Sequence, residues 1–203
     1  MTQLDIFNNA LLHLGISDLL ASTSDGSKAS IVLGHLWEQA RDYALKDYHP
    51  RFARRYAALV ENTAAIVPTN WAKVFTLPTD CLHAHGGVVE GQRTMALASR
   101  IPYELGIQSL GSPAVATRLL YTDEDTFELE YTAKVEDVAL YEPMFCLALG
   151  YLLASLAATG MGKGDTGPSL MEAYMRAASS AAAHDMNQGF DHEPESSWIT
   201  GRL

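Results

Sequence analysis

The sequence is poor in cysteine and in positive charge. Its 203 residues include two cysteines, Cys81 and Cys146, which lie far apart in the chain. Such a pair is more typical of free thiols in a reducing compartment than of a disulfide framework. Lysine and arginine number 14 against 24 acidic residues, a formal net charge of −10. Counterion release needs clustered cations, so this composition argues against a protein that grips nucleic acid and allows one that surrounds it.

Targeting signals and the common catalytic motifs are also missing from the sequence. The first residues have no basic segment, and Asp5 interrupts their apolar part, so we expect no secretory signal there. No serine lies in a G-x-S-x-G elbow. The glycine-rich stretch GMGKGDTG at 160–167 is not a phosphate loop, because Gly164 follows Lys163 where a Walker A motif has serine or threonine. We therefore expect no enzyme, no catalytic residue, no cofactor and no metal ion.

One run of twenty residues, 143–162, has no charged side chain. Its length suits either a membrane span or a helix buried on nearly every side. Several glycines and hydroxyl residues dilute its apolar content, and its flanks lack Lys/Arg clusters, so we predict a core helix near 141–159 and no membrane contact. Three large residues are expected in the subunit core: Leu147, Tyr151 and Leu156. The small residues are expected to let another helix lie close, with Ala148, Tyr151, Ser155 and Leu156 in subunit packing and Thr159 beside them.

The hydrophobic periodicity predicts a mainly α protein with a small β lobe, of the α+β class. Thr2 is a helix cap with Asp5 three residues later, and Gly15 suits the end of that helix. A second helix, 28–48, ends at His49-Pro50, and RFARRYAAL is a short basic turn. The middle of the chain alternates with period two, which is typical of strands. The expected organisation is a bundle of about four helices from 1–69 and 137–187, an inserted antiparallel β-hairpin region at 70–136, and an extended C-terminal tail at 188–203.

Two clusters of polar residues are candidate sites. His83 and His85 would share a face of a strand and could bind zinc, with Cys81 nearby, but no further ligand accompanies them at a recognisable spacing. A surface strand or loop therefore explains them better. The acidic residues Asp123, Glu124 and Asp125 lie between two predicted strands, at 117–121 and 127–135. They form either a solvated turn or an acidic rim that repels DNA.

Several phrases of the sequence resemble the head-to-tail adaptors of short-tailed phages, the tail tubular protein A family, and related portal-bound connectors. The opening NNALLHLGIS is followed by LWEQARDYALKDYHPRFARRYAAL, in which His49-Pro50-Arg51-Phe52-Ala53 is similar to a family phrase. FTLPTDCL at 75–82 resembles another. The segment LLYTDEDTFELEYTAKVEDVALYEPMFCLALGYLLASLAA is similar to the family's strand, turn, strand and apolar helix. The resemblance covers most of the chain and is weakest at 83–115.

The resemblance implies a structural virion protein without catalytic residues. Such a protein would assemble in the host cytoplasm as a homo-oligomeric ring, expected to be a dodecamer, in the neck of the virion. It would bind the portal protein and a downstream tail or nozzle protein, and double-stranded DNA would pass through without specific binding. Asp123, Glu124 and Asp125 would face that channel. By position, the portal-docking residues would lie in the tail: Phe190, Trp198, Ile199 and Leu203. Two other classes remain open: a soluble helical adaptor outside a virion, and a small enzyme using Cys81, His83 and His85.

Overall fold

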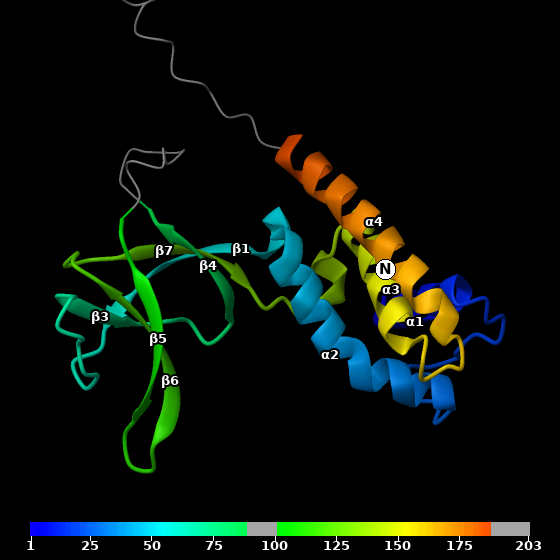
Figure 1. Cartoon of the computed structure of the whole chain (residues 1–203), viewed down its shortest axis with the longest axis horizontal. Coiled ribbons are helices and arrows are strands. Elements are labelled where there is room, and N and C mark those ends of the chain that lie inside the picture. The colour runs from blue at the N-terminus through cyan, green and yellow to red at the C-terminus, as the bar shows by residue number, and fades with distance from the viewer. Residues whose placement is uncertain (89–100, 188–203) are drawn as a thin grey trace, which may run out of the picture.

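The computed structural model describes residues 1–88 and 101–187 and shows a helical lobe beside a β lobe (Figure 1). This arrangement confirms the predicted mixed α+β class. The predicted tail residues Phe190, Trp198, Ile199 and Leu203 lie outside the described residues. None of the described helices is both long enough and apolar enough to cross a bilayer.

The elements alternate between the two lobes in chain order. The helices are α1 (Gln3–His13), α2 (Lys28–Tyr48), α3 (Pro143–Ala157) and α4 (Gly167–Asn187), with short 3₁₀ turns at Arg51–Ala53, Val138–Leu140 and Gly164–Thr166. The strands are β1 (Arg54–Ala58), β2 (Val60–Glu61), β3 (Lys73–Thr76), β4 (Cys81–Gly87), β5 (Glu104–Leu110), β6 (Val115–Thr122) and β7 (Glu128–Ala133).

The helix ends follow the local signals in the sequence. Thr2 and Asp5 form a reciprocal capping box, in which each side chain accepts the other's backbone N–H, at 3.2 and 2.7 Å. Gly15 has a φ of 70°, which suits glycine just beyond a helix end. Ser27 caps α2 through the backbone N–H of Ser30. The sequence predicted these boundaries because each depends on residues within one turn of the helix.

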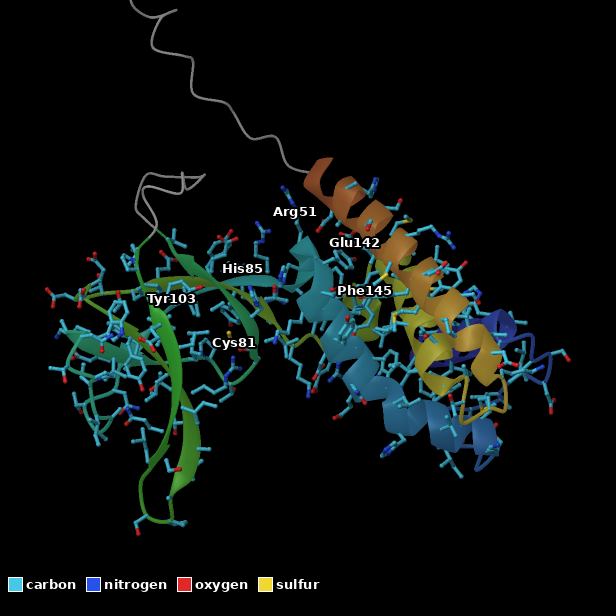
Figure 2. The ribbon with its side chains drawn as sticks, viewed as in Figure 1. Arg51, Cys81, His85, Tyr103, Glu142 and Phe145 are labelled. Atoms are coloured by element: carbon cyan, nitrogen blue, oxygen red, sulfur yellow. The ribbon has the colours of Figure 1, made fainter. Side chains whose placement is uncertain are left out.

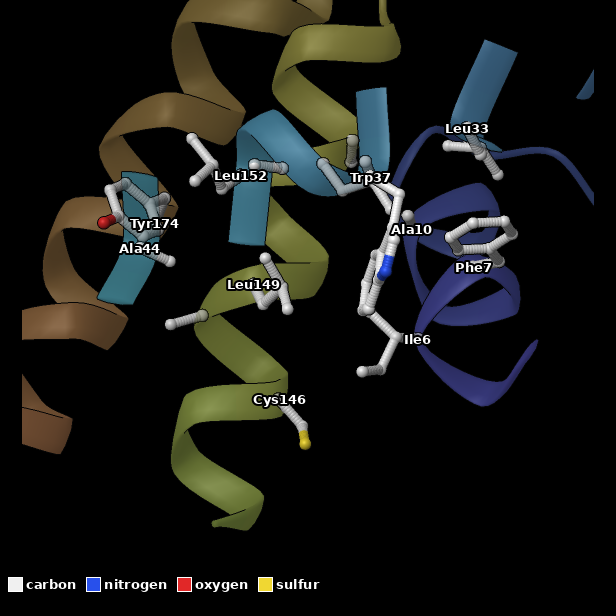
Figure 3. Packing of buried hydrophobic residues seen from close by; sticks show 14 of the residues in the cluster. Ile6, Phe7, Ala10, Leu33, Trp37, Ala44, Cys146, Leu149, Leu152 and Tyr174 are labelled. Carbon is white, nitrogen blue, oxygen red and sulfur yellow. The ribbon is translucent and has the colours of Figure 1, made fainter. Parts of the chain in front are cut away.

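The uncharged run forms the central helix of the bundle, and α3 packs against α1, α2 and α4. Phe7 and Trp37 meet edge-on at 5.6 Å between ring centroids, while Leu149 and Leu152 lie in the same core with Tyr174 (Figure 3). The chain itself supplies nearly all the cover that α3 needs. Burial of apolar surface contributes about 25 cal/mol per Å², so the packing around α3 is the main source of stability of the helical lobe.

One expectation about α3 is wrong. Leu147 is 40% exposed and lies outside the core, because the arc of α3 that is covered by the other helices does not include it. Ala148, one of the small residues expected to let another helix lie close, is fully buried within its own chain. On the same stripe, the Ser155 hydroxyl donates to the Gly167 carbonyl at 2.9 Å, which shows that the close helix is α4. Tyr151 and Leu156 are partly buried at the edge of this core.

The β lobe consists of two antiparallel sheets with an apolar core between them. The first has the order β1-β7-β4 and the second β2-β3-β6-β5. Phe75 and Leu120 from the second sheet meet Leu129 and Tyr131 from the first. Cys81 is buried in this core and Cys146 in the helical core, and both are free thiols as predicted. Burial raises the pKa of both thiols.

Two features of this lobe differ from those predicted from the sequence. RFARRYAAL is not only a turn, because residues 54–58 form β1 and pair with β7, so the chain enters the β lobe well before residue 70. The strands around Asp123–Asp125 are present, yet they do not form a hairpin: β6 belongs to one sheet and β7 to the other. The acidic segment is therefore the crossing between two sheets.

Candidate functional site at the junction of the two lobes

Three histidines meet where the end of α2 lies against β4 and β7, and we call them the histidine cluster: His49, His83 and His85. One ring nitrogen from each lies within 4.8 Å of the others. The ring centroids are 4.4 Å apart for His49 and His83, 4.7 Å for His49 and His85, and 5.1 Å for His83 and His85. All three side chains are half-buried. The cluster thus joins one residue of the helical lobe to two of the β lobe.

The backbone brings His49 to this position at an energetic cost. His49 caps the C-terminus of α2 with φ 56° and ψ 60°, the left-handed conformation. Among the described residues it is the one non-glycine residue with a positive φ. A non-glycine side chain in this region costs on the order of 1 kcal/mol, although histidine tolerates it better than most. Pro50 follows and fixes the direction of the chain as it leaves α2.

The strands aim the other two imidazoles at the same face. β4 pairs with the central strand β7, and the register shifts between Ala84 and Gly86. A bulge of this kind re-aims a side chain. Ala84 and Cys81 are buried in the core between the sheets. His83 and His85 lie against His49 at the end of α2 instead, and Figure 2 shows His85 near that helix.

Thr132 lies at the centre of the histidine cluster. Thr132 lies on β7, where it pairs with His83 on β4, and it is 1% exposed. The hydroxyl oxygen is 2.8 Å from Nε2 of His85 and 3.2 Å from Nδ1 of His49. A hydroxyl oxygen has two lone pairs, so it can accept an N–H from both rings. In that arrangement the second nitrogen of each ring carries a free lone pair.

The surroundings keep the imidazoles neutral. Desolvation, with the neighbouring His49 and His83 and the cation of Arg54, lowers the pKa of His85 to about 4. Burial is also the main cause of the lowered pKa of His49 and of His83. Arg54 also pairs with Glu130 at 3.1 Å, and Asp47 acts against Lys46 on the pKa of His49. Neutral imidazoles at pH 7 are bases and metal donors rather than cations.

The residues that meet here differ from the predicted set of Cys81, His83 and His85. The two histidines come together as their spacing predicted, but Cys81 is not in the group of ligand atoms within reach among the described residues. His49 takes its place. Sequence spacing could not identify His49, since it lies 34 residues before His83 and on the other lobe; the His49-Pro50 helix stop was its only local signal.

The predicted acidic site is exposed and partly engaged in local contacts. The carboxylate of Asp123 accepts the backbone N–H of Ala72 at 3.0 Å. Asp125 is 3.7 Å from the ammonium of Lys73. Glu124 is exposed. These contacts brace the crossing between the sheets and leave its carboxylates facing solvent.

The projecting hairpin β5–β6 carries a surface that was not predicted from the sequence (Figure 1). In β5, Leu105 is 45% and Ile107 70% exposed, and β5 is an edge strand of its sheet. The other face of β5 is anchored, because the Gln108 amide bonds both the backbone of Ile66 and the hydroxyl of Tyr121. The alternation in β5 was available in the sequence, but this region resembled no pattern considered there.

Comparison of the chain with protein-family models and with curated protein sequences gives no match.

Proposed function

We propose that this chain is a structural adaptor of a phage virion, which assembles as a ring beneath the portal and joins it to the tail. The proposal begins from the phrases LPTDCL and YTAKVEDVALYEPMF, which resemble the head-to-tail adaptor family. The geometry adds that the chain has a closed helical core and a separate β lobe carrying a projecting arm. An arm of this kind suits contact with a neighbouring molecule.

The observation that carries the proposal is the edge strand β5. An edge strand with exposed apolar residues is a template for association, and monomeric proteins usually protect such edges with charge or cover. Leu105 and Ile107 are exposed on this strand, and Val115 on β6 is 62% exposed. We assign this surface to a contact with the next copy of the chain in the ring.

Electrostatics support the channel role. The chain carries a net charge of −10, and exposed carboxylates of Asp123, Glu124 and Asp125 gather on one crossing. A negative channel wall would not hold DNA, so ejection would meet little drag. The docking of the tail residues 190–203 on the portal remains part of the proposal.

The experiment is assembly of the purified chain on portal rings of the same phage, followed by sedimentation. Ile107→Glu should stay monomeric and dissociated from neighbours, while Ile107→Leu should assemble like the natural chain. Both variants should keep the wild-type circular dichroism, because Ile107 is outside the core. Assembly of Ile107→Glu at wild-type concentration would contradict the assigned contact. A chain that dimerises without binding portal would instead indicate an adaptor outside a virion.

A further inference from the structure

We propose that the histidine cluster is a binding site for a divalent transition-metal ion, with Zn²⁺ the best chemical match, and that the ion ties the helical lobe to the β lobe. The inference is independent of ring assembly, because all its ligands come from one chain. It contradicts the expectation, drawn from sequence spacing, that the chain holds no metal.

The first argument is the donor set. Three neutral imidazoles are a known ligand set for zinc, with water completing the coordination. Zn–N bonds of about 2.0–2.1 Å in tetrahedral geometry separate two ligand nitrogens by roughly 3.3 Å. One ring nitrogen each of His49, His83 and His85 lies within 4.8 Å of the other two. Closing that difference requires side-chain rotations, since α2 and the β4–β7 ladder already hold the backbone.

The second argument is the shell around the ligands. Metal-binding histidines usually donate their other N–H to an oxygen, which fixes the tautomer and the ring orientation. The Thr132 hydroxyl is placed for this role toward both His49 and His85, at 3.2 and 2.8 Å. Because Thr132 is 1% exposed on a central strand, its oxygen is held firmly. One oxygen thus orients two of the three ligands.

The third argument is the strain at His49. A left-handed C-cap is most often glycine or asparagine. Here histidine occupies it, and the imidazole that it carries is the one group that the helical lobe contributes to the cluster. Strained residues concentrate at functional sites. A structural metal would offset this strain, and it would fix the angle at which α2 meets the β lobe.

Titration of the full-length chain with ZnCl₂, followed by calorimetry, tests the proposal. We expect saturable binding of one ion per chain. His49→Asn and His83→Gln should each weaken binding about 100-fold or more, since loss of a second-shell partner alone already costs 10–100-fold. Asparagine tolerates the left-handed conformation, so His49→Asn should remain folded. The matched control is His35→Gln, which removes an exposed imidazole from α2 and should bind like the natural chain.

A second measurement needs no variant. The chain has seven histidines, and one equivalent of Zn²⁺ should shift the imidazole NMR signals of three of them while leaving His35 and His184 unchanged. Zn²⁺ should also raise the melting temperature of the natural chain and not that of His49→Asn. Absence of saturable binding would overturn the proposal, as would equal affinity of His49→Asn and the natural chain, or shifts confined to histidines outside the cluster.

Discussion

Replacing Thr132 with valine isolates the contribution of one buried hydroxyl to the lobe junction. The two side chains have nearly the same shape, so the central strand β7 keeps its packing. The substitution removes the hydroxyl oxygen, which lies 2.8 Å from Nε2 of His85 and 3.2 Å from Nδ1 of His49. Both ring nitrogens then lose their partner inside the protein.

The expected loss of stability follows from these two contacts. An unsatisfied buried polar group costs about 1–3 kcal/mol. Both imidazoles are half-buried, so water recovers part of this, and we expect a total loss of about 2 kcal/mol. With a urea m-value of roughly 2–3 kcal/mol/M, the unfolding midpoint should fall by about 0.7–1 M.

The assay is urea unfolding of the metal-free protein at pH 7.5, with EDTA present. Thr132→Ser is the control, because it keeps the hydroxyl and loses only a methyl group, for about 1 kcal/mol. Valine should therefore be the more damaging substitution, although it is the more apolar one. If Thr132→Val is as stable as the natural chain, or more stable than Thr132→Ser, the hydroxyl does not hold the imidazoles.

Three further predictions concern the junction, the bundle and the hairpin. The pKa of His85 is lowered to about 4 in the folded state, so acid favours the unfolded state: stability from its neutral form is present above the unfolded pKa of about 6.5 and is lost as pH falls toward 4. Between pH 7.5 and 5 the metal-free chain should lose on the order of 1–2 kcal/mol more than His85→Gln in urea titrations, and equal losses would refute this. Ala148→Glu buries an unpaired carboxylate and should unfold the single chain, as measured by circular dichroism. Leu147→Glu changes a position that is 40% exposed and should leave the chain folded. A folded Ala148→Glu chain would contradict the packing of α3. Gly106→Ala would place a Cβ 2.6 Å from the Tyr121 ring, so the melting temperature should fall by the equivalent of about 1–3 kcal/mol, and an unchanged value would show that the ring moves freely.

The elements that the sequence predicted are those fixed by near neighbours. The Thr2 cap with Asp5 and the His49-Pro50 stop each act within a few residues. The composition of 143–162 was enough to predict a core helix in this run: α3 spans Pro143–Ala157, and nine of its residues are buried. The strands predicted at 117–121 and 127–135 are present as β6 and β7, which span Val115–Thr122 and Glu128–Ala133. These features needed no knowledge of the partner elements.

The elements that were not predicted from the sequence depend on contacts between residues far apart in the chain. Residues 54–58 form a strand because β7, more than seventy residues later, offers a ladder of hydrogen bonds. Two adjacent strands, β6 and β7, enter different sheets, which alternation cannot reveal. Leu147 lies outside the core because the arc of α3 that its own chain covers depends on where the other helices lie. His49 joined His83 and His85 only through the tertiary fold.

Electron microscopy of portal rings saturated with this chain tests the central claim of an adaptor most directly. The account predicts a second ring on one face of the portal, with twelve copies of the chain and with β5 of each copy against its neighbour. Portal rings that remain bare at saturating concentrations of a folded, full-length chain would contradict it.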